Sequence, residues 1–495
     1  MKIRTTKTAS GATAVQVVRY EYGKTIMVKH FGSAKEPGEI LLLKQTAFDW
    51  ITNTTHLQSF FPEELTFDPL FSKYQYVGVR HNFLYEILTQ IFSLFGFEKL
   101  DNRLLLDLVL IRMVEPSSKL RSQKLLSELF GVSYDLTLIY KSLKTIATLK
   151  DATEALLIDF AKLKLHFDFS FVLYDVTTLY FESFKADEED EGLRKNGFSK
   201  DNKPQQPQII IGLLVNGDGF PLSFSVFPGN KFEGHTLIPV ISALQKKYHI
   251  PTLTVVADSA MISQDNIQAL KAAHLSFIVG ARLGYLNLNT VNKISQELNL
   301  TDRVSIRIPW SSGFLICDFS SKRYAKDKSD TEKQVNRANR VLEGKTSTKR
   351  LKFLTGEKTS QTLNQKLIER TKLLWGVKGY FTDLSLPNEL VITQYHNLWQ
   401  VEKSFRMSKS DLLMRPVYHF KKQAIEAHIL ICMMALAVAK YIELKSGKSI
   451  RVVLDALKKV TDARVVSIAT NEEALWRSVI SEETKQLLQD LEVTY

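Results

Sequence analysis

Two short apolar runs, each ending in a single aspartate, constrain the fold of this chain more than any other feature. Phe171–Tyr180 reads FVLYDVTTLY, and its apolar first half leads into Asp175. Leu253–Ser259 reads LTVVADS and leads into Asp258 in the same way. A continuous run of apolar, β-forming residues is typical of a strand that is buried in a sheet. The pattern predicts two buried strands, each bringing one carboxylate to a sheet edge, although either aspartate taken alone could simply begin a turn.

A third acid, Glu402, lies in the segment YHNLWQVEKSFRMSK, which has the periodicity of a helix. Residues three or four positions apart share one face of a helix. Five side chains of this segment are therefore expected on one face: Tyr395, Trp399, Glu402, Arg406 and Lys409. An ordinary surface helix with a Glu402–Arg406 ion pair is the alternative. If the three acids meet, they form a carboxylate trio suited to divalent metal ions and phosphate esters, and a basic cluster that includes Arg415 and His419 follows the third acid.

The segments around the first two acids predict a mixed sheet. Gln208–Val215 and Phe220–Phe227 read as strands joined by Asn-Gly-Asp-Gly, a strong hairpin turn. Helices at Gly234–Lys247 and Gln264–Ala273 and a strand at Ser276–Val279 follow. The order strand, hairpin, helix, strand, helix, strand indicates an α/β fold of the RNase H-like type, a mixed sheet flanked by helices.

Composition changes along the chain predict six regions. We expect a strand-rich basic region at 1–75, a helical, DNA-binding region at 76–165, and the first part of the catalytic core at 166–283. A β-rich insertion at 284–375, the second part of the core at 376–445 and a helical region at 446–495 complete the chain. Within these regions we expect a strand at Glu39–Leu43 and a helix at Glu472–Ile480.

The charge balance points to a polyanionic partner. The chain has 65 Lys and Arg against 53 Asp and Glu, a net charge of +12. Pro116 and the serines after it allow a helix–turn–helix in which Lys119 and Arg121 lie on the second helix and contact DNA. The stretch Ser321–Lys352, with eleven basic residues and four acids, is either a second DNA-gripping surface or a solvated helix.

Other classes of protein fit the sequence poorly. Its two cysteines, Cys317 and Cys432, match no zinc spacing, and the N-terminal segment has no signal-peptide pattern. The longest apolar run, Ile429–Ala439, is too short to span a bilayer and predicts a core helix. Gly447-Lys448-Ser449 resembles the end of a P-loop, but Ile442 stands where that motif needs glycine. We therefore expect a cytoplasmic protein without a membrane partner.

Four blocks of sequence carry a family resemblance: YDVTTLYFE, GFSKDNKPQQPQIIIGLLVNGDGFPLSFSVFPGN, VVADSAM, and YHNLWQVEKSFRMSK with RPVYH after it. The chain resembles DDE transposases of bacterial insertion sequences, in the large insertion-sequence-four-like group whose insertion domain interrupts an RNase H-like fold. The resemblance covers about residues 80–445. In the family's third block a tyrosine is followed by an arginine, a glutamate and a lysine. Tyr395, Glu402 and Lys409 match this pattern, but Leu398 stands at the arginine position and Arg406 is expected to replace that contact.

The resemblance implies a mechanism and partners. Asp175, Asp258 and Glu402 would be catalytic and would hold two Mg²⁺, with Mn²⁺ as a substitute. The enzyme would cut double-stranded DNA at the terminal inverted repeats of its element and join the 3′-OH ends to target DNA, as a homodimer in the DNA complex. Tyr395, Arg406, Lys409 and Arg415 would position the phosphate. Two alternatives remain open here: a metal-dependent nuclease without strand transfer, and a non-catalytic DNA-binding regulator.

Overall fold

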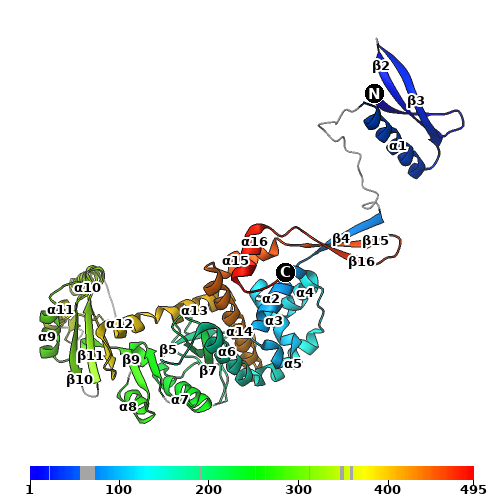
Figure 1. The fold of residues 1–495 in the computed structure, drawn as a ribbon. Helices are drawn as coiled ribbons and strands as arrows, with labels where there is room; N and C mark the ends of the chain where they lie inside the picture. Colours follow the sequence, from blue (N-terminus) through cyan, green and yellow to red (C-terminus); the bar gives the residue numbers. More distant parts are fainter. Residues whose placement is uncertain are drawn as a thin grey trace. The chain divides into compact units, whose positions relative to one another are not determined.

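The computed structural model describes residues 1–21, 23–55, 73–189, 191–250, 252–261, 263–310, 313–345, 351–356 and 361–495 (Figure 1). The predictions for residues 1–75 and for Ser321–Lys352 extend over 56–72 and 346–350, which lie outside the described residues. The chain divides into two compact units, Met1–Gln75 with Val466–Glu472 and Tyr76–Val465 with Glu473–Tyr495.

The N-terminal part of the first unit is an antiparallel sheet with one helix. Strands β1 (Lys2–Lys7), β2 (Thr13–Glu21) and β3 (Lys24–Ala34) pair in the order β1-β2-β3, and α1 (Pro37–Thr55) follows. The predicted strand at Glu39–Leu43 is wrong, because these residues belong to α1. Ile40, Leu43 and Ala47 recur at helical spacing and pack against buried Val15 and Val17 of β2. A five-residue apolar window is too short to separate strand from helix.

The second unit contains an eight-stranded sheet in the order β10-β11-β14-β9-β8-β5-β6-β7. Strands β5 (Phe171–Tyr180), β6 (Gln208–Val215) and β7 (Pro221–Pro228) form an antiparallel meander. Strands β8 (Thr254–Ala257) and β9 (Ser276–Gly280) join β5 in parallel, after the crossover helices α7 (Leu237–Tyr248) and α8 (Gln264–Ala272). This is the mixed sheet flanked by helices that the sequence predicted.

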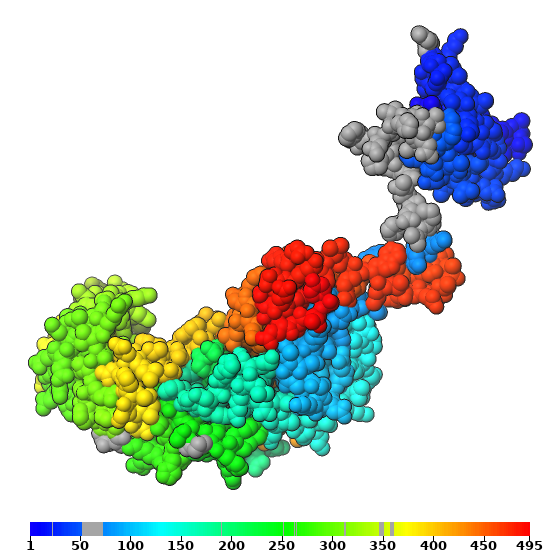
Figure 2. Space-filling model, in the orientation of Figure 1, coloured from blue at the N-terminus to red at the C-terminus, as the bar shows by residue number. Residues whose placement is uncertain are grey.

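Three strands that come from the insertion and from the segment after it extend the same sheet. β10 (Ser305–Trp310), β11 (Gly313–Phe319) and β14 (Val377–Thr382) pair antiparallel, and β14 pairs with β9. Helices α9 (Leu288–Leu298), α10 (Ser321–Leu342) and α11 (Gln365–Leu373) gather around this end of the sheet (Figure 1). A separate small core that includes Val291, Ile294 and Leu315 holds the strands to α9. Figure 2 shows the segment after β14, in yellow, lying against the light green insertion.

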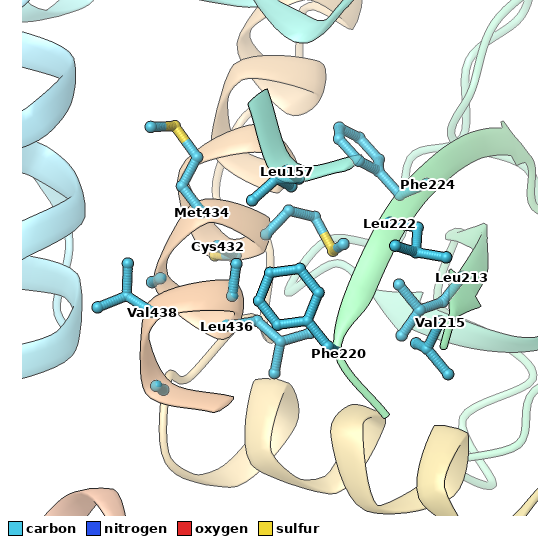
Figure 3. Packing of buried hydrophobic residues seen from close by; sticks show 14 of the residues in the cluster. Leu157, Leu213, Val215, Phe220, Leu222, Phe224, Cys432, Met434, Leu436 and Val438 are labelled. Carbon is cyan, nitrogen blue, oxygen red and sulfur yellow. The ribbon is translucent and has the colours of Figure 1, made fainter. Parts of the chain in front are cut away.

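The other end of the sheet, at β7, packs on the last two of six helices, and the other four pack on helices. The helices are α2 (Asn82–Leu94), α3 (Arg103–Val114), α4 (Lys119–Phe130), α5 (Leu136–Thr148), α6 (Lys150–Leu165) and α14 (Lys422–Ser446). In Figure 3, side chains of α14 such as Met434 and Leu436 lie beside Leu157 of α6 and Phe220, which directly precedes β7. Among the described residues α14 alone is long and apolar enough to cross a membrane, but 94% of its apolar window is buried in the protein. The predicted core helix is therefore confirmed.

The C-terminal region mixes helices and strands. It contains α15 (Ile450–Lys458), β15 (Asp462–Ser467), β16 (Glu473–Arg477) and α16 (Glu482–Asp490), and a small sheet has the order β16-β15-β4, where β4 is Tyr74–Arg80. The helix predicted at Glu472–Ile480 is wrong. Arg464 of β15 donates two hydrogen bonds, of 2.7 and 2.8 Å, to the carboxylate of Glu473. Such cross-strand pairs stabilise a hairpin, and a search for helical periodicity does not see them.

Candidate active site

Two of the predicted acids lie at matching positions on neighbouring parallel strands. In the register of β5 and β8, Tyr174 is opposite Ala257, so Asp175 and Asp258 are the next residues along the two strand paths. Asp258 follows the end of β8 as predicted, but the prediction that Asp175 ends its strand is wrong, because β5 continues to Tyr180 in its pairing with β6. Glu402 comes from the first turn of α13 (Trp399–Ser410). All three acids line one cavity of about 360 Å³. The structure therefore brings together the three acids that the sequence singled out.

Asp175 has an unfavourable environment for a negative charge. The pKa of its carboxyl group is raised from 3.8 to about 6, chiefly by burial and to a smaller extent by the negative charges of Asp258 and Glu233. The Lys200 ammonium and a hydrogen bond of 2.7 Å from the Val176 backbone N–H act in the opposite direction. A cation placed in this cavity would stabilise the ionised form.

Asp258 is oriented by two donors. Its Oδ1 accepts a hydrogen bond of 2.6 Å from the Ser259 backbone N–H and one of 3.1 Å from the Tyr395 hydroxyl. Burial and Asp258 raise the pKa of Tyr395, so the phenol remains a donor at neutral pH. A Cβ atom at Gly280 would lie 2.4 Å from the Tyr395 hydroxyl, so this glycine leaves the space in which the tyrosine reaches Asp258.

The predicted single helix across Tyr395 and Glu402 is wrong. Helix α12 (Asn388–His396) ends just after Tyr395, and α13 begins at Trp399. Between them the Leu398 N–H bonds to the Tyr395 carbonyl and the Gln400 N–H to the Asn397 carbonyl, which is the i to i−3 pattern of a tight 3₁₀ turn. Tyr395 therefore reaches the site from a different helix, directed at Asp258, and does not share a helical face with Glu402.

A second cavity of about 300 Å³ shares Asp175 and Glu402 with the first and has a basic wall. Four cationic side chains line it: Lys200, Arg406, Lys409 and Arg415. Asp201 forms ion pairs with Lys409, at 3.6 Å, and with Arg415. Burial lowers the pKa of Lys409, and Asp201 partly offsets this effect. Lys200, which the sequence did not single out, lies 3.0 Å from Glu233 and donates a hydrogen bond of 2.8 Å to the Val176 carbonyl.

Two bases that the sequence did not identify line the cavity of the acids. They are Arg323 of α10 and Lys378 of β14, and Leu398 lines the same cavity. Burial and then Arg323 lower the pKa of Lys378, whereas nearby acids, including Asp258, raise it. Leu398, which stands where the family has an arginine, therefore lines a cavity in which Arg323 and Lys378 already supply positive charge. Nothing local in the sequence marks Arg323 among the eleven basic residues of its stretch.

The two bases predicted on the second helix of the helix–turn–helix lie outside the cavity of the acids. Ser118 caps α4, as expected, by accepting a hydrogen bond from the Arg121 N–H. Arg121 is exposed and lies 3.6 Å from Glu128. Lys119 is only 4% exposed, because it points inward and not onto an open helix face. It lines a different cavity, which Arg415 also lines.

The donor chemistry of the acids fits a hard divalent cation, which prefers carboxylate oxygens. Within the described ranges no three His, Cys, Asp or Glu side chains are close enough to surround a metal ion, although the three acids line one cavity. Carboxylates without a cation between them repel each other, which accounts for an open arrangement. The raised pKa of Asp175 is consistent with a site that requires added positive charge.

Comparisons with known proteins gave a family match and a similar solved structure. A family model described as a transposase DDE domain matches residues 166–438, a span that includes all three acids. Among solved structures, the chain is similar to piggyBac transposase in a synaptic complex with hairpin DNA, with 11% sequence identity and a TM-score of 0.39. That similarity covers 76% of this chain and 78% of the other. No curated protein matches the chain.

Proposed function

The chain belongs to the family of transposase DDE domains, and from this premise we propose that it cuts DNA at the ends of an insertion sequence and joins the 3′-OH ends to target DNA. The observation that carries the proposal is the single cavity lined by Asp175, Asp258 and Glu402, with basic side chains on both flanks. Acids at the centre suit metal ions, and bases around them suit the charged backbone of DNA.

The three acids would hold divalent cations, Mg²⁺ in the first place and Mn²⁺ as a substitute. When bound, such ions would activate the attacking hydroxyl group and stabilise the leaving 3′ oxygen. The hydrogen bond from Tyr395 would fix the orientation of the Asp258 carboxylate, as outer-shell partners of metal ligands commonly do. Glu402, which is exposed on α13, would complete the set once a cation removes the repulsion among the acids.

Phosphate positioning would fall to the bases of the two cavities. Arg406 is exposed, whereas Lys409 and Arg415 are paired with Asp201 in the protein alone. A DNA phosphate would compete with Asp201 for these two cations. Arg323 and Lys378 would contact the strand on the opposite flank, where Leu398 offers no charge. Contacts of this kind fix the register of DNA without reading its sequence.

The element ends would bind as double-stranded terminal inverted repeats, and two copies of the chain would coordinate the two cuts. A homodimer in the DNA complex is the simplest arrangement that gives one active site to each end.

Cleavage of a supercoiled plasmid that carries the element ends, in the presence of Mg²⁺, tests the proposal. We expect Glu402→Gln to reduce cutting and end joining by roughly a hundredfold or more, as for loss of a metal ligand or its close support. Glu389→Gln is the matched control, because Glu389 is an exposed acid on α12 that does not line the site. End-specific binding without metal-dependent cutting by the wild type would favour a regulator. Cutting without end joining would favour a nuclease.

A further inference from the structure

A cavity outside the catalytic site has the charge of an anion-binding site. It measures about 330 Å³ and lies between the α3–α4 turn and the segment that connects α13 to α14. Five of the residues that line it are basic: Arg112, Lys119, Arg415, His419 and His428. None of its described lining residues is an acid.

The bases at the bottom of this cavity are buried without a counter-charge. Arg112 is 5% exposed and Lys119 is 4% exposed, and neither forms an ion pair with an acid in the described part of the chain. The Arg112 Nη2 donates one hydrogen bond of 2.9 Å to the Ser117 carbonyl. Burial of a cation is strongly unfavourable unless a partner offsets the lost hydration. Two adjacent buried cations therefore point to a ligand that supplies negative charge.

His428 gives an independent indication. It is 5% exposed, and its Nε2 lies 3.0 Å from the Met414 carbonyl, while its Nδ1 is buried without a hydrogen-bond partner. Buried polar atoms are nearly always paired in native proteins, so an orphaned nitrogen beside a cavity needs an explanation. Burial, Arg112 and Lys119 lower the pKa of His428 well below its usual value, and burial lowers that of Lys119 to about 7. Because Nε2 faces a carbonyl oxygen it carries the hydrogen, so Nδ1 of the neutral ring is an acceptor; a bound anion would favour the protonated ring, in which the Nδ1–H becomes a donor.

The backbone adds to the positive potential. Lys119 is the first residue of α4, a helix of 12 residues, and Ser117 and Ser118 at its start line the cavity. The N-terminus of a helix carries a partial positive charge and free N–H groups, which favour phosphate. Here that end faces the same cavity as the buried side chains.

We propose that this cavity binds a phosphate group. A guanidinium, an ammonium and a helix N-terminus together match the several acceptor oxygens of a phosphate. The phosphate has two possible sources, a DNA phosphodiester and free inorganic phosphate. Arg415 lines both this cavity and the basic cavity beside the acids, so a strand in the catalytic site could extend to it. Binding of a DNA phosphate in this cavity rests on the proposed function, whereas binding of free inorganic phosphate does not.

The first arm of the test uses inorganic phosphate and the full chain, measured by isothermal titration calorimetry at fixed ionic strength. We expect Lys119→Met to weaken phosphate binding by at least about tenfold, the loss typical of one charge-assisted contact. Lys144→Gln, an exposed lysine on α5, should bind as the wild type does. Methionine keeps the length of the side chain and removes a buried charge, so folding should be preserved, and His428→Gln serves as a second variant.

The second arm uses a duplex of the element end in which one phosphate at a time is replaced by a neutral methylphosphonate. Binding is measured without a divalent metal ion, so that the result does not depend on cutting. At one position, the methylphosphonate should weaken DNA binding by the wild type and by Lys144→Gln but should not change DNA binding by Lys119→Met. A position of this kind would identify a DNA phosphate as the ligand of the cavity. If inorganic phosphate binds in the first arm and no such position exists, the ligand is the free anion. A wild-type protein that shows neither would overturn the proposal, even if plasmid cleavage succeeds.

Discussion

Replacement of Asp175 by asparagine should stabilise the metal-free protein at alkaline pH. Burial raises the pKa of this carboxyl group from 3.8 to about 6, a difference of about 2 units. Since one unit corresponds to about 1.4 kcal/mol, the ionised side chain lowers the free energy of unfolding by up to about 3 kcal/mol. Solvent reaches part of the side chain and the amide is also polar, so we expect a gain of roughly 1 to 3 kcal/mol for Asp175→Asn at pH 8.

The sign of the pH dependence follows from proton linkage. Above pH 6 Asp175 is ionised in both the folded and the unfolded chain, and the wild type carries the full destabilisation. Between pH 6 and about 4 the folded chain binds the proton first, so the destabilisation decreases as the pH falls. Below pH 4 both states are protonated. The advantage of Asp175→Asn should therefore be largest at pH 8 and should disappear below about pH 4.

The assay is urea denaturation in EDTA at pH 8, 6 and 4, followed by tryptophan fluorescence. Asp168, which precedes the same strand, is the matched control. Its carboxylate accepts hydrogen bonds from the Ser170 hydroxyl at 2.6 Å and the Ser170 N–H at 2.9 Å, and these bonds lower its pKa. Asp168→Asn should therefore destabilise the protein at pH 8 and lose this effect as the pH falls through the lowered pKa of Asp168.

Added Mg²⁺ or Mn²⁺ provides the decisive comparison. A divalent cation held by the acids should stabilise the wild type more than it stabilises Asp175→Asn. The stability advantage of Asp175→Asn should therefore shrink or reverse when the metal is added. An Asp175→Asn gain that is absent at pH 8, or that stays constant from pH 8 to 4, would refute the reasoning about burial. A metal response that is equal in both proteins would refute the assignment of Asp175 as a ligand.

Two further substitutions test the surroundings of the acids. Gly280→Ala would place a Cβ atom 2.4 Å from the Tyr395 hydroxyl. DNA cutting should fall roughly tenfold to a hundredfold in the plasmid assay, whereas Gly284→Ala, which has open space, should cut normally. Arg323→Gln should reduce the slope of log affinity against log salt for end DNA by about 1, because one phosphate contact is lost. Lys326→Gln, an exposed position on the same helix, should keep the wild-type slope, and equal slopes for all three proteins would exclude Arg323 from the DNA surface.

The sequence was sufficient to predict that Asp175 and Asp258 lie together, because two general rules apply. An apolar run that ends in an acid marks the end of a buried strand, and parallel strands joined by a right-handed crossover end at the same edge of a sheet. The observed register, with Tyr174 opposite Ala257, is what these rules require. Asp258 follows β8 directly, whereas Asp175 lies within β5, one residue beyond the last pair that β5 forms with β8, so the rules placed the two carboxylates side by side but did not predict that β5 continues to Tyr180.

The remaining parts of the site depend on contacts that no local pattern records. Arg323 reaches the cavity from a helix of the insertion, and Lys378 from a strand that lies between β11 and β9 in the sheet although it is far from β9 in the sequence. The break between α12 and α13 was also missed, since Leu398 is a good helix former and only Asn397 beside it is poor. Lys119 was expected on an open helix face, but tertiary packing turned it inward, toward buried His428.

The distribution of charge connects these findings. One cavity gathers three acids and needs cations, and the cavity beyond Arg415 gathers bases and needs an anion. Between them, the basic cavity is lined by Asp175 and Glu402 together with Lys409, Arg406 and Arg415. The acids come from β5, from the end of β8 and from α13, whereas the buried bases Arg112 and Lys119 come from α3 and α4. If both proposals hold, a bound metal ion and a bound DNA phosphate would each favour binding of the other, and by linkage this coupling would be equal in both directions.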